Sequence, residues 1–340
     1  MSDVKNARAA EALAQEAEPG ELSMRETSGE AAPAAQAAEP SVQVADAEPV
    51  VQVADAEPVE QVADAEEPVE LSMHETQQIA LEILHTVAEI CEKLELRYFL
   101  VYGTLIGAVR HQGFIPWDDD VDIMMPRPDH DKLMEYFDGH IAAYPHLTVF
   151  NRKTCPEYPY MITRISDDRT EIRMENEKPF GMGVFIDIYP YDGLGNDKKE
   201  AVRFGMKGDR LSSLCYQASR DHFAIETTKS LWRKAVKYPV YLFCKALGKE
   251  RFQDALEKLA RVKPYDTSRF VGCVIWLSWG VKDMYLRKWF ENYVYQPFEK
   301  YQFRIPAEYD RVLRHTYGDY MQLPPVEERT GHHYYKAYWK

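Results

Sequence analysis

The sequence of 340 residues has few cysteines and no long apolar run, and each absence excludes a class of protein. Its five cysteines lie far apart and include no Cys-x-x-Cys pair, which excludes a disulfide framework and a cysteine-bound zinc site. No stretch of about twenty apolar residues is present, and the first residues have no apolar core typical of signal peptides. We therefore expect a cytoplasmic protein, with Cys91 and Cys244 as buried thiols.

The folded part also lacks an excess of charge. The chain has 41 basic and 55 acidic residues, but residues 1–69 alone contain sixteen of the acids and only three of the bases. Residues 70–340 are therefore close to neutral, and they contain no motif typical of nucleic-acid recognition. A nucleic-acid partner is not expected.

Residues 1–69 form an acidic, low-complexity segment with few aromatic or large aliphatic residues. The stretch VQVADAEPV occurs twice in succession, at Val42–Val50 and Val51–Val59. Such a short period fits no common repeat fold, and the composition cannot offset the entropy cost of ordering. We expect a disordered tail over 1–69, which is either a partner-binding arm or, as we favour, a solvated extension. The folded domain is expected over 70–340.

The pattern of residues 70–340 predicts an α/β (α+β) fold, a mixed sheet flanked by helices. Ser72 and Glu75 have the spacing of a capping box ahead of a helix. Hydrophobic periodicity predicts a core over about 70–195 and a mainly helical part over about 196–340. The expected elements are helices at Gln77–Leu94, Thr104–His111, from Pro128, and over Asp197–Lys263, and strands at Arg97–Tyr102, Asp120–Met124, YMITRI and GVFIDIY.

The stretch PWDDDVDI, Pro116–Ile123, places four carboxylates within five positions. On a strand, Asp120 and Asp122 would share one face, and Asp118 would join them only if the chain turned after Trp117. Carboxylates this close repel one another, and a divalent cation between them would remove the repulsion. Ligands that are all oxygen favour Mg²⁺ or Mn²⁺ over zinc. The alternative is a solvated acidic turn. An EF-hand is excluded, because its loop requires Gly and Glu at positions that hold other residues here.

Two other segments favour the metal site. In YGTLIGAVR, a strand runs through a Gly103-Thr104 turn into a helix, whose N-terminus can hold a phosphate. Arg110 can reach that phosphate or pair with the Asp cluster. In GVFIDI, Asp187 is a carboxylate in an apolar strand and needs a partner, which a metal shared with Asp120 and Asp122 would supply.

Four stretches together carry a family resemblance: YFLVYGTLIGAVRHQGFIPWDDDVDIMMPR, GVFIDIYPYDGL, YGDYMQLPP and GHHYYKAYW. They resemble the LicD family of phosphocholine transferases over about Leu71 to Lys340, although after Asp192 the match is confined to scattered motifs. The resemblance implies a nucleotidyltransferase-like core. It also implies transfer of a phosphorylated alcohol from a CDP-activated donor to a hydroxyl of a cell-surface glycan or glycolipid, such as lipopolysaccharide or teichoic acid.

The resemblance further implies roles for individual residues. Asp120 and Asp122 match the catalytic Asp-x-Asp metal pair, and Asp187 matches the third carboxylate. Asp118 matches a further metal-binding acid of the fukutin-related branch, whose zinc-binding cysteines have no counterpart here. Gly103 and Thr104 match the turn that holds the donor phosphate.

The group transferred stays open at this point. A choline group would require an aromatic cage, for which Trp117, Tyr160 and Tyr189 are candidates, although core packing is the alternative for each. Phosphoethanolamine, glycerol phosphate and ribitol phosphate are alternatives to phosphocholine. Two other functions stay open. One is a nucleotidyltransferase that keeps the nucleoside monophosphate, and the other is a non-catalytic binding protein.

Three further features remain, and the first two have two interpretations each. The segment Lys229–Lys263 has ten bases and three acids, and it is either a helix lying on the anionic inner-membrane surface or a solvated face. His332 and His333 would point apart on a strand and form a poor metal pair; they touch phosphate or belong to an aromatic tail. Gly318 and the prolines of YGDYMQLPP predict a fixed turn.

Overall fold

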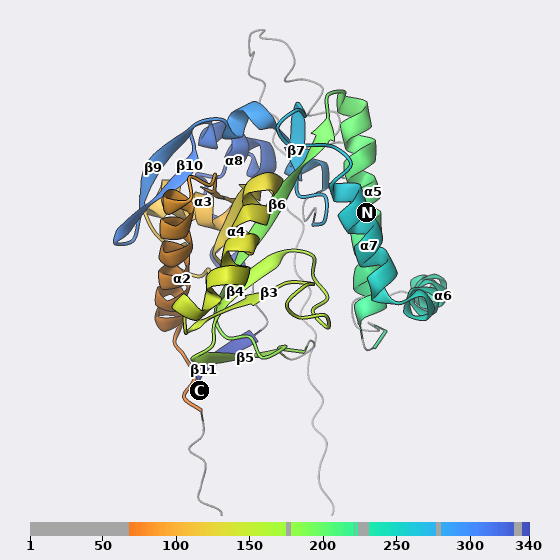
Figure 1. Cartoon of the computed structure of the whole chain (residues 1–340), viewed down its shortest axis with the longest axis horizontal. Helices are drawn as coiled ribbons and strands as arrows, with labels where there is room; N and C mark the ends of the chain where they lie inside the picture. Colours follow the sequence, from red (N-terminus) through yellow and green to blue (C-terminus); the bar gives the residue numbers. More distant parts are fainter. Residues whose placement is uncertain (1–67, 175–177, 221, 224–230, 277–279, 330–334) are drawn as a thin grey trace, which may run out of the picture.

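The computed structural model describes residues 68–174, 178–220, 222–223, 231–276, 280–329 and 335–340 (Figure 1). The predicted disordered tail over 1–69 lies outside these residues except at its last two positions, and so do His332 and His333. Within the described ranges, the chain forms a mixed sheet with helices packed around it, which confirms the α/β fold.

The centre of the fold is one long strand, β6 (Phe185–Gly195), in which every residue is buried. Strands buried on both faces are usually continuous apolar runs, so its two carboxylates, Asp187 and Asp192, need specific partners. β6 pairs in parallel with β2 and antiparallel with β4 and β7. The strands of this sheet are β1 (Phe99–Leu100), β2 (Asp122–Pro126), β3 (Leu147–Phe150), β4 (Thr163–Asp167), β6, β7 (Phe270–Gly272) and β8 (Tyr285–Leu286). Five of them follow the order β1-β2-β6-β4-β3, β7 pairs with the C-terminal half of β6, and β8 pairs with β7.

The first helix, α2 (Met73–Lys93), begins at the predicted capping box. The Glu75 amide donates to the Ser72 hydroxyl over 3.3 Å, and the Glu75 carboxylate accepts from the Ser72 amide over 2.8 Å. These two bonds satisfy N–H groups that a helix start leaves open, which explains why the helix begins four residues before the predicted Gln77. Its buried stripe packs on β4 and β6.

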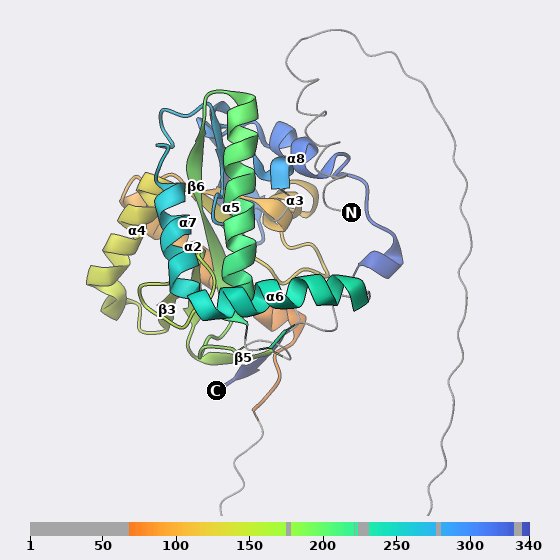
Figure 2. The ribbon, with the colours of Figure 1, turned by 90° about the vertical axis from the view of Figure 1, so that its right-hand side faces the viewer.

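Helices cover both sides of the sheet. Figure 1 shows α2 on one side of β6, and α5 with α7 on the other. In Figure 2, α5, α7 and α6 lie in front of the sheet. The remaining helices are α3 (Tyr102–His111), α4 (Arg127–His140), α5 (Lys198–Ser219), α6 (Leu231–Leu247), α7 (Lys249–Ala260) and α8 (Tyr309–Tyr317), with 3-10 turns η1 (Ile141–Ala143), η2 (Gly280–Asp283), η3 (Arg287–Phe290) and η4 (Val326–Glu328).

Within Asp197–Lys263, the helical prediction is confirmed in the described residues by α5, α6 and α7, but the chain returns to strands after that point. A hairpin of β9 (Tyr293–Phe298) and β10 (Tyr301–Pro306) follows, and β11 (Tyr335–Trp339) pairs with β5 (Thr170–Met174). The aromatic and β-branched composition of YVYQPF is the signal for β9 that the helical prediction overlooked.

The end of the chain returns to the start of the folded part. The Leu71 amide donates to the Ala337 carbonyl over 2.7 Å, and the Trp339 amide donates to the Val69 carbonyl over 3.0 Å. The C-terminal stretch that carries part of the family resemblance is therefore integrated into the domain.

Two predictions from composition can be compared with the structure. Cys91 and Cys244 are buried free thiols, as expected, and the other three cysteines are also unpaired in the described part of the chain. None of the helices described here is both long and apolar enough to span a bilayer.

Candidate active site

Three charged side chains form a row across the centre of the sheet. In the strand register, Asp122 of β2 lies beside Asp187 of β6, and Asp187 lies beside Arg164 of β4. Residues in register on neighbouring strands project from the same face, so the row places two carboxylates and one guanidinium together. All three are buried or nearly so.

Arg164 is the partner of Asp187. Its Nε atom lies 2.7 Å from Oδ1 of Asp187, and the guanidinium carbon lies 4.2 Å from the Phe185 ring centroid and 5.0 Å from that of Tyr160. Burial opposes the charged form, but the negative charge of Asp187 raises the pKa of Arg164 well above its usual value. The prediction that Asp187 needs a partner is confirmed, and that partner is Arg164; a metal shared with Asp120 and Asp122 stays a prediction. An arginine within the apolar YMITRI was the signal that the sequence analysis missed.

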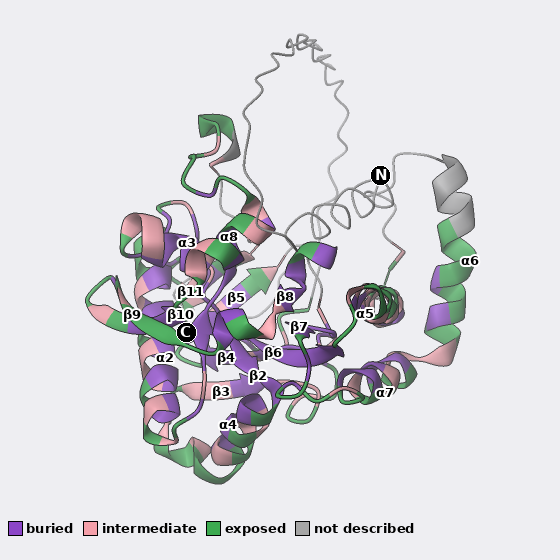
Figure 3. Cartoon of the chain, turned by 90° about the horizontal axis from the view of Figure 1, so that it is seen from above, coloured by how far each residue is buried: buried purple, intermediate pink, exposed green. Residues whose placement is uncertain are grey.

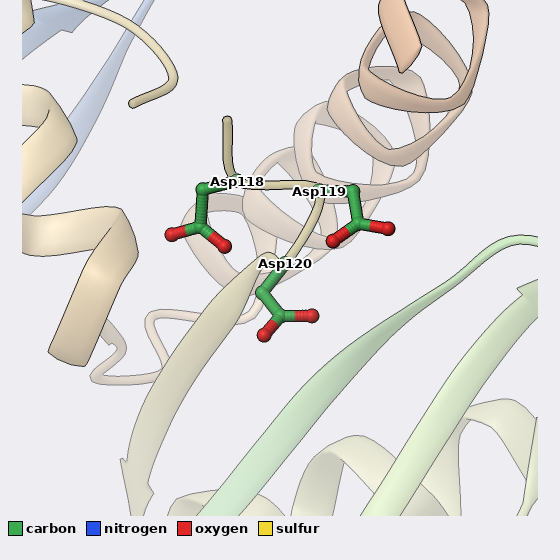
Figure 4. A group of neighbouring side chains, drawn as sticks. All are labelled: Asp118, Asp119 and Asp120. Atoms are coloured by element: carbon green, nitrogen blue, oxygen red, sulfur yellow. The ribbon is translucent and has the colours of Figure 1, made fainter. Parts of the chain in front are cut away.

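The Asp cluster itself lies mostly on a loop. β2 begins at Asp122, two residues later than predicted, so the argument that Asp120 and Asp122 share one face of a strand is wrong. The loop instead gathers Asp118, Asp119 and Asp120, each of which offers one carboxylate oxygen, and these oxygens lie within 4.8 Å of one another. Figure 4 shows the three carboxyl groups around one common space next to the start of the strand. Asp119 was not among the predicted ligands, because the strand-parity argument passed over it.

Two side chains hold this loop in place. Gln77 of α2 donates to the Asp118 carbonyl over 2.8 Å. The Thr104 hydroxyl accepts from the Asp122 amide over 2.8 Å and donates to the Asp120 carbonyl over 3.4 Å. Thr104 thus positions the loop. Its predicted contact with a donor phosphate stays a prediction and would compete with these bonds.

Gly103 gives the loop room to approach helix α3. This helix starts at Tyr102, so Gly103 and Thr104 belong to its first turn and do not form a separate turn before it. A Cβ atom on Gly103 would lie 2.6 Å from Oδ2 of Asp118, which is far too close. The group that approaches the helix N-terminus in the structure is thus the Asp118 carboxylate, at a position where negative charge is favourable.

The loop and the row together concentrate negative charge. Burial, and then the negative charges of Asp122 and Asp118, raise the pKa of Asp120 well above its usual value. Burial and the charge of Asp187 raise the pKa of Asp122 in the same way, although a hydrogen bond with Tyr189 opposes the shift. Asp120 and Asp122 therefore resist ionisation, and one arginine does not balance the charge of the five carboxylates. A hard divalent cation with oxygen ligands fits this donor set.

The predicted donor-binding residues Arg110 and Trp117 contact other parts of the protein. Arg110 Nη1 donates to the Tyr320 carbonyl over 2.6 Å, and no ion pair joins it to the Asp cluster in the described residues. The guanidinium carbon of Arg329 lies 5.4 Å from the Trp117 ring centroid. A cation thus already occupies a face of that ring.

The other two cage candidates are engaged as well. Tyr160 carries the Arg164 guanidinium on its ring, and Tyr189 is buried with its ring edge-to-face against Tyr102, 5.2 Å between centroids. The packing alternative therefore describes both tyrosines better than an open cage does. The fixed turn in YGDYMQLPP is confirmed, because α8 ends at Tyr317 and Gly318 follows with φ 75°.

Comparisons with known proteins identify what this chain is similar to. Residues 95–203 match the LicD/FKTN/FKRP nucleotidyltransferase domain, and this range contains every predicted site residue. The chain is 31% identical over 276 residues to the lipopolysaccharide cholinephosphotransferase LicD of Haemophilus influenzae, which covers 79% of this chain and 98% of that protein. It is also 34% identical over 79 residues to the uncharacterized protein RP689 of Rickettsia prowazekii, over 22% of this chain and 30% of that protein.

Proposed function

Because the chain belongs to the LicD family and is a phosphotransferase, we propose that it transfers phosphocholine from CDP-choline to a hydroxyl of lipopolysaccharide or its precursor. The single observation that carries the chemistry is the gathering of five carboxylates beside one arginine at the start of β2. The similarity to the Haemophilus influenzae enzyme supports the transferred group and the acceptor class.

We propose that a divalent cation, Mg²⁺ or Mn²⁺, binds at Asp118, Asp119, Asp120 and Asp122, with Asp187 beside them. When bound, such an ion neutralises the negative charge of a diphosphate and of the leaving nucleotide. Its ligands are held by the protein before the ion arrives, since Thr104 and Gln77 fix the backbone of the loop. Tyr189 and Arg164 orient the two strand carboxylates, through hydrogen bonds to Asp122 and Asp187.

The transfer forms a bond between the acceptor oxygen and phosphorus and breaks the bond between phosphorus and the CMP oxygen. The acceptor hydroxyl loses one proton in this step, and a positioned, ionised carboxylate can accept it. We assign this role to Asp120, which is less buried than the other four. Asp187 is less suited because Arg164 already binds it. Most of the remaining catalysis is positioning and charge stabilisation.

The other donors remain alternatives that one assay separates. CMP release is measured from CDP-choline, CDP-ethanolamine, CDP-glycerol and CDP-ribitol with a lipopolysaccharide or teichoic-acid acceptor, with Mg²⁺ or with EDTA. We expect turnover of CDP-choline with the lipopolysaccharide acceptor, loss with EDTA, and loss in Asp122→Asn. The matched control is Asp254→Asn, which changes an exposed carboxylate on α7 paired with Arg152. Release of the phospho-alcohol in place of CMP, with the CMP group joined to the acceptor, would identify a nucleotidyltransferase. No turnover of any donor would favour a binding protein.

We also propose that α6 contacts an anionic membrane surface that carries a lipid-linked acceptor. Tyr241 and Cys244 are buried, whereas the outward side exposes Tyr238, Leu242 and Phe243, the last by 60%. Figure 3 shows α6 at the periphery of the molecule with much of its described surface exposed. Exposed apolar side chains on a helix in a basic segment are typical of interfacial binding.

Co-sedimentation with vesicles tests this contact. Binding is expected to anionic vesicles and to weaken in Phe243→Glu, whereas neutral vesicles should bind little. Equal binding of the wild type and Phe243→Glu would support the alternative that α6 is a solvated face.

A further inference from the structure

Two arginines from distant parts of the sequence lie close together near Trp117. Arg110 is in the last turn of α3, and Arg329 directly follows η4. Arg329 lies over the Trp117 ring, and His111 meets the same ring edge-to-face at 6.5 Å between centroids. All four side chains are only partly buried, so the group stays accessible from solvent.

The chain segment between α8 and η4 fixes both guanidinium groups. Its carbonyl oxygens accept from Arg110 Nη1, over 2.6 Å at Tyr320 and 3.5 Å at Gln322, and from Arg329 Nε, over 3.0 Å at Pro324. Neutral carbonyls orient a guanidinium without cancelling its charge. A guanidinium has five N–H donors. Within the described residues, these bonds leave most donors of Arg329 and some donors of Arg110 able to bind a further acceptor.

The two positive charges are close, and burial together with the charge of Arg329 lowers the pKa of Arg110. Arg164 in the active site faces a carboxylate within hydrogen-bond distance. Among the residues that the structure describes, neither Arg110 nor Arg329 has such a partner. Holding two like charges together costs free energy, which an anion between them would recover.

We propose that Arg110, Trp117 and Arg329 form an oxyanion site that binds a phosphate-type group next to the metal carboxylates. Trp117 directly precedes Asp118 in the sequence, so a group bound here lies at the edge of the acid cluster. The same charges repel a trimethylammonium group, so the site excludes the choline end of the donor. As an assignment of substrate parts, this inference rests on the proposed function. The phosphate-type group belongs either to the donor diphosphate or to a phosphate carried by the acceptor.

Binding of inorganic pyrophosphate to the whole protein in EDTA tests the site without any transfer reaction. With no divalent cation available, the carboxylates repel pyrophosphate, and the arginines alone attract it. We expect calorimetric binding by the wild type and at least about tenfold weaker binding by Arg329→Gln, which is the scale of one lost charge-assisted hydrogen bond. Arg329→Lys should recover part of the affinity, because a lysine keeps the charge but not the fork of donors.

Arg311→Gln is the matched control. Arg311 is an exposed arginine of α8 that pairs with Glu308, so the same substitution there should leave pyrophosphate binding unchanged. Arg110→Gln gives a second test from another element, and thermal unfolding of each variant shows whether it is folded. Equal binding by the wild type, Arg329→Gln and Arg110→Gln, or no binding by the wild type, would overturn the proposal.

The source of the group follows from the transfer assay. In Arg329→Gln, a raised KM for the CDP-linked donor assigns the site to the donor diphosphate, whereas a raised KM for the acceptor assigns it to an acceptor phosphate. If no donor is consumed by the wild type but pyrophosphate binding is lost in Arg329→Gln, the proposed function fails and the oxyanion site stands. If Arg329→Gln turns over normally and both KM values are unchanged, the proposed function stands and the oxyanion site fails.

Discussion

Strand β6 carries two buried carboxylates, Asp187 and Asp192, and each is paired with an arginine, yet the two pairs have different surroundings. Arg127 binds Asp192 through two parallel hydrogen bonds of 2.7 and 2.9 Å, and the Asp192 side chain is 1% exposed. Arg164 binds Asp187 through one hydrogen bond of 2.7 Å, and Asp122 lies beside it in register. The first pair is balanced and closed, whereas the second is one part of an acidic cluster with excess negative charge.

This difference separates a structural ion pair from a functional one. A buried pair with matched charges has no capacity to bind anything further. A buried pair beside four more carboxylates has unbalanced charge that a cation can neutralise. We therefore expect a divalent cation to change the behaviour of the second pair and not that of the first.

The largest expected effect is the loss of activity in Asp122→Asn. The substitution preserves shape but removes a metal ligand and one of the negative charges that face Asp187. CMP release should fall at least about 100-fold, the scale of losing one group that stabilises developing charge. The free energy of unfolding without metal should stay the same or rise, because like-charge repulsion is relieved. Retained activity in Asp122→Asn would remove the cluster from the reaction.

The next effect is on stability, at the closed pair. Arg127→Met leaves Asp192 buried without its partner, and breaking such a pair costs about 3–5 kcal/mol of unfolding free energy. Chemical denaturation measures this value. The double variant Arg127→Met/Asp192→Leu should recover much of the loss, since it removes the unpaired charge. A double variant as unstable as Arg127→Met alone would contradict the idea that the pair is self-contained.

Arg164→Met at the open pair should behave differently. The unpaired Asp187 again destabilises the fold, but a divalent cation can replace the missing positive charge. Saturating Mg²⁺ should therefore raise the midpoint of thermal unfolding more in Arg164→Met than in Arg127→Met, because a ligand stabilises only the state that binds it. Equal shifts in the two variants would erase the distinction between the pairs.

The smallest effect is the pH dependence of stability. Because the pKa values of Asp120 and Asp122 are raised, the folded protein without metal holds more protons than the unfolded chain. Its stability is then present at low pH and is lost as pH rises through the raised pKa values. Added Mg²⁺ should suppress this loss, because it stabilises the ionised carboxylates. Burial also raises the pKa of Asp192, so a residual dependence should persist with metal. A metal-free protein that gains stability across the same range would contradict the assignment.

The sequence predicted those features that depend on local pattern. The capping box of α2, the Gly318 turn and the apolar strand around Asp187 each have a residue-level signal. The gathering of the acids at one place also followed from their spacing. Each of these depends on residues close together in the chain.

Features that depend on pairing between distant segments could not be predicted in this way. Arg164 meets Asp187 only through the register of β4 on β6, and Arg329 reaches Trp117 from more than two hundred residues away. The start of β2 at Asp122 depends on the Thr104 hydroxyl, which holds the preceding loop out of the sheet. A single sequence does not specify such register or contact.

The most direct test of the account is Mn²⁺ binding to the whole protein, followed by electron paramagnetic resonance, in the wild type, Asp122→Asn and the exposed-site control Asp254→Asn. The account predicts binding by the wild type and the control, and at least about tenfold weaker binding by Asp122→Asn, as expected when a ligand is removed. Equal Mn²⁺ affinity in all three proteins would show that the acid cluster is not a metal site, and the proposed mechanism would then fail.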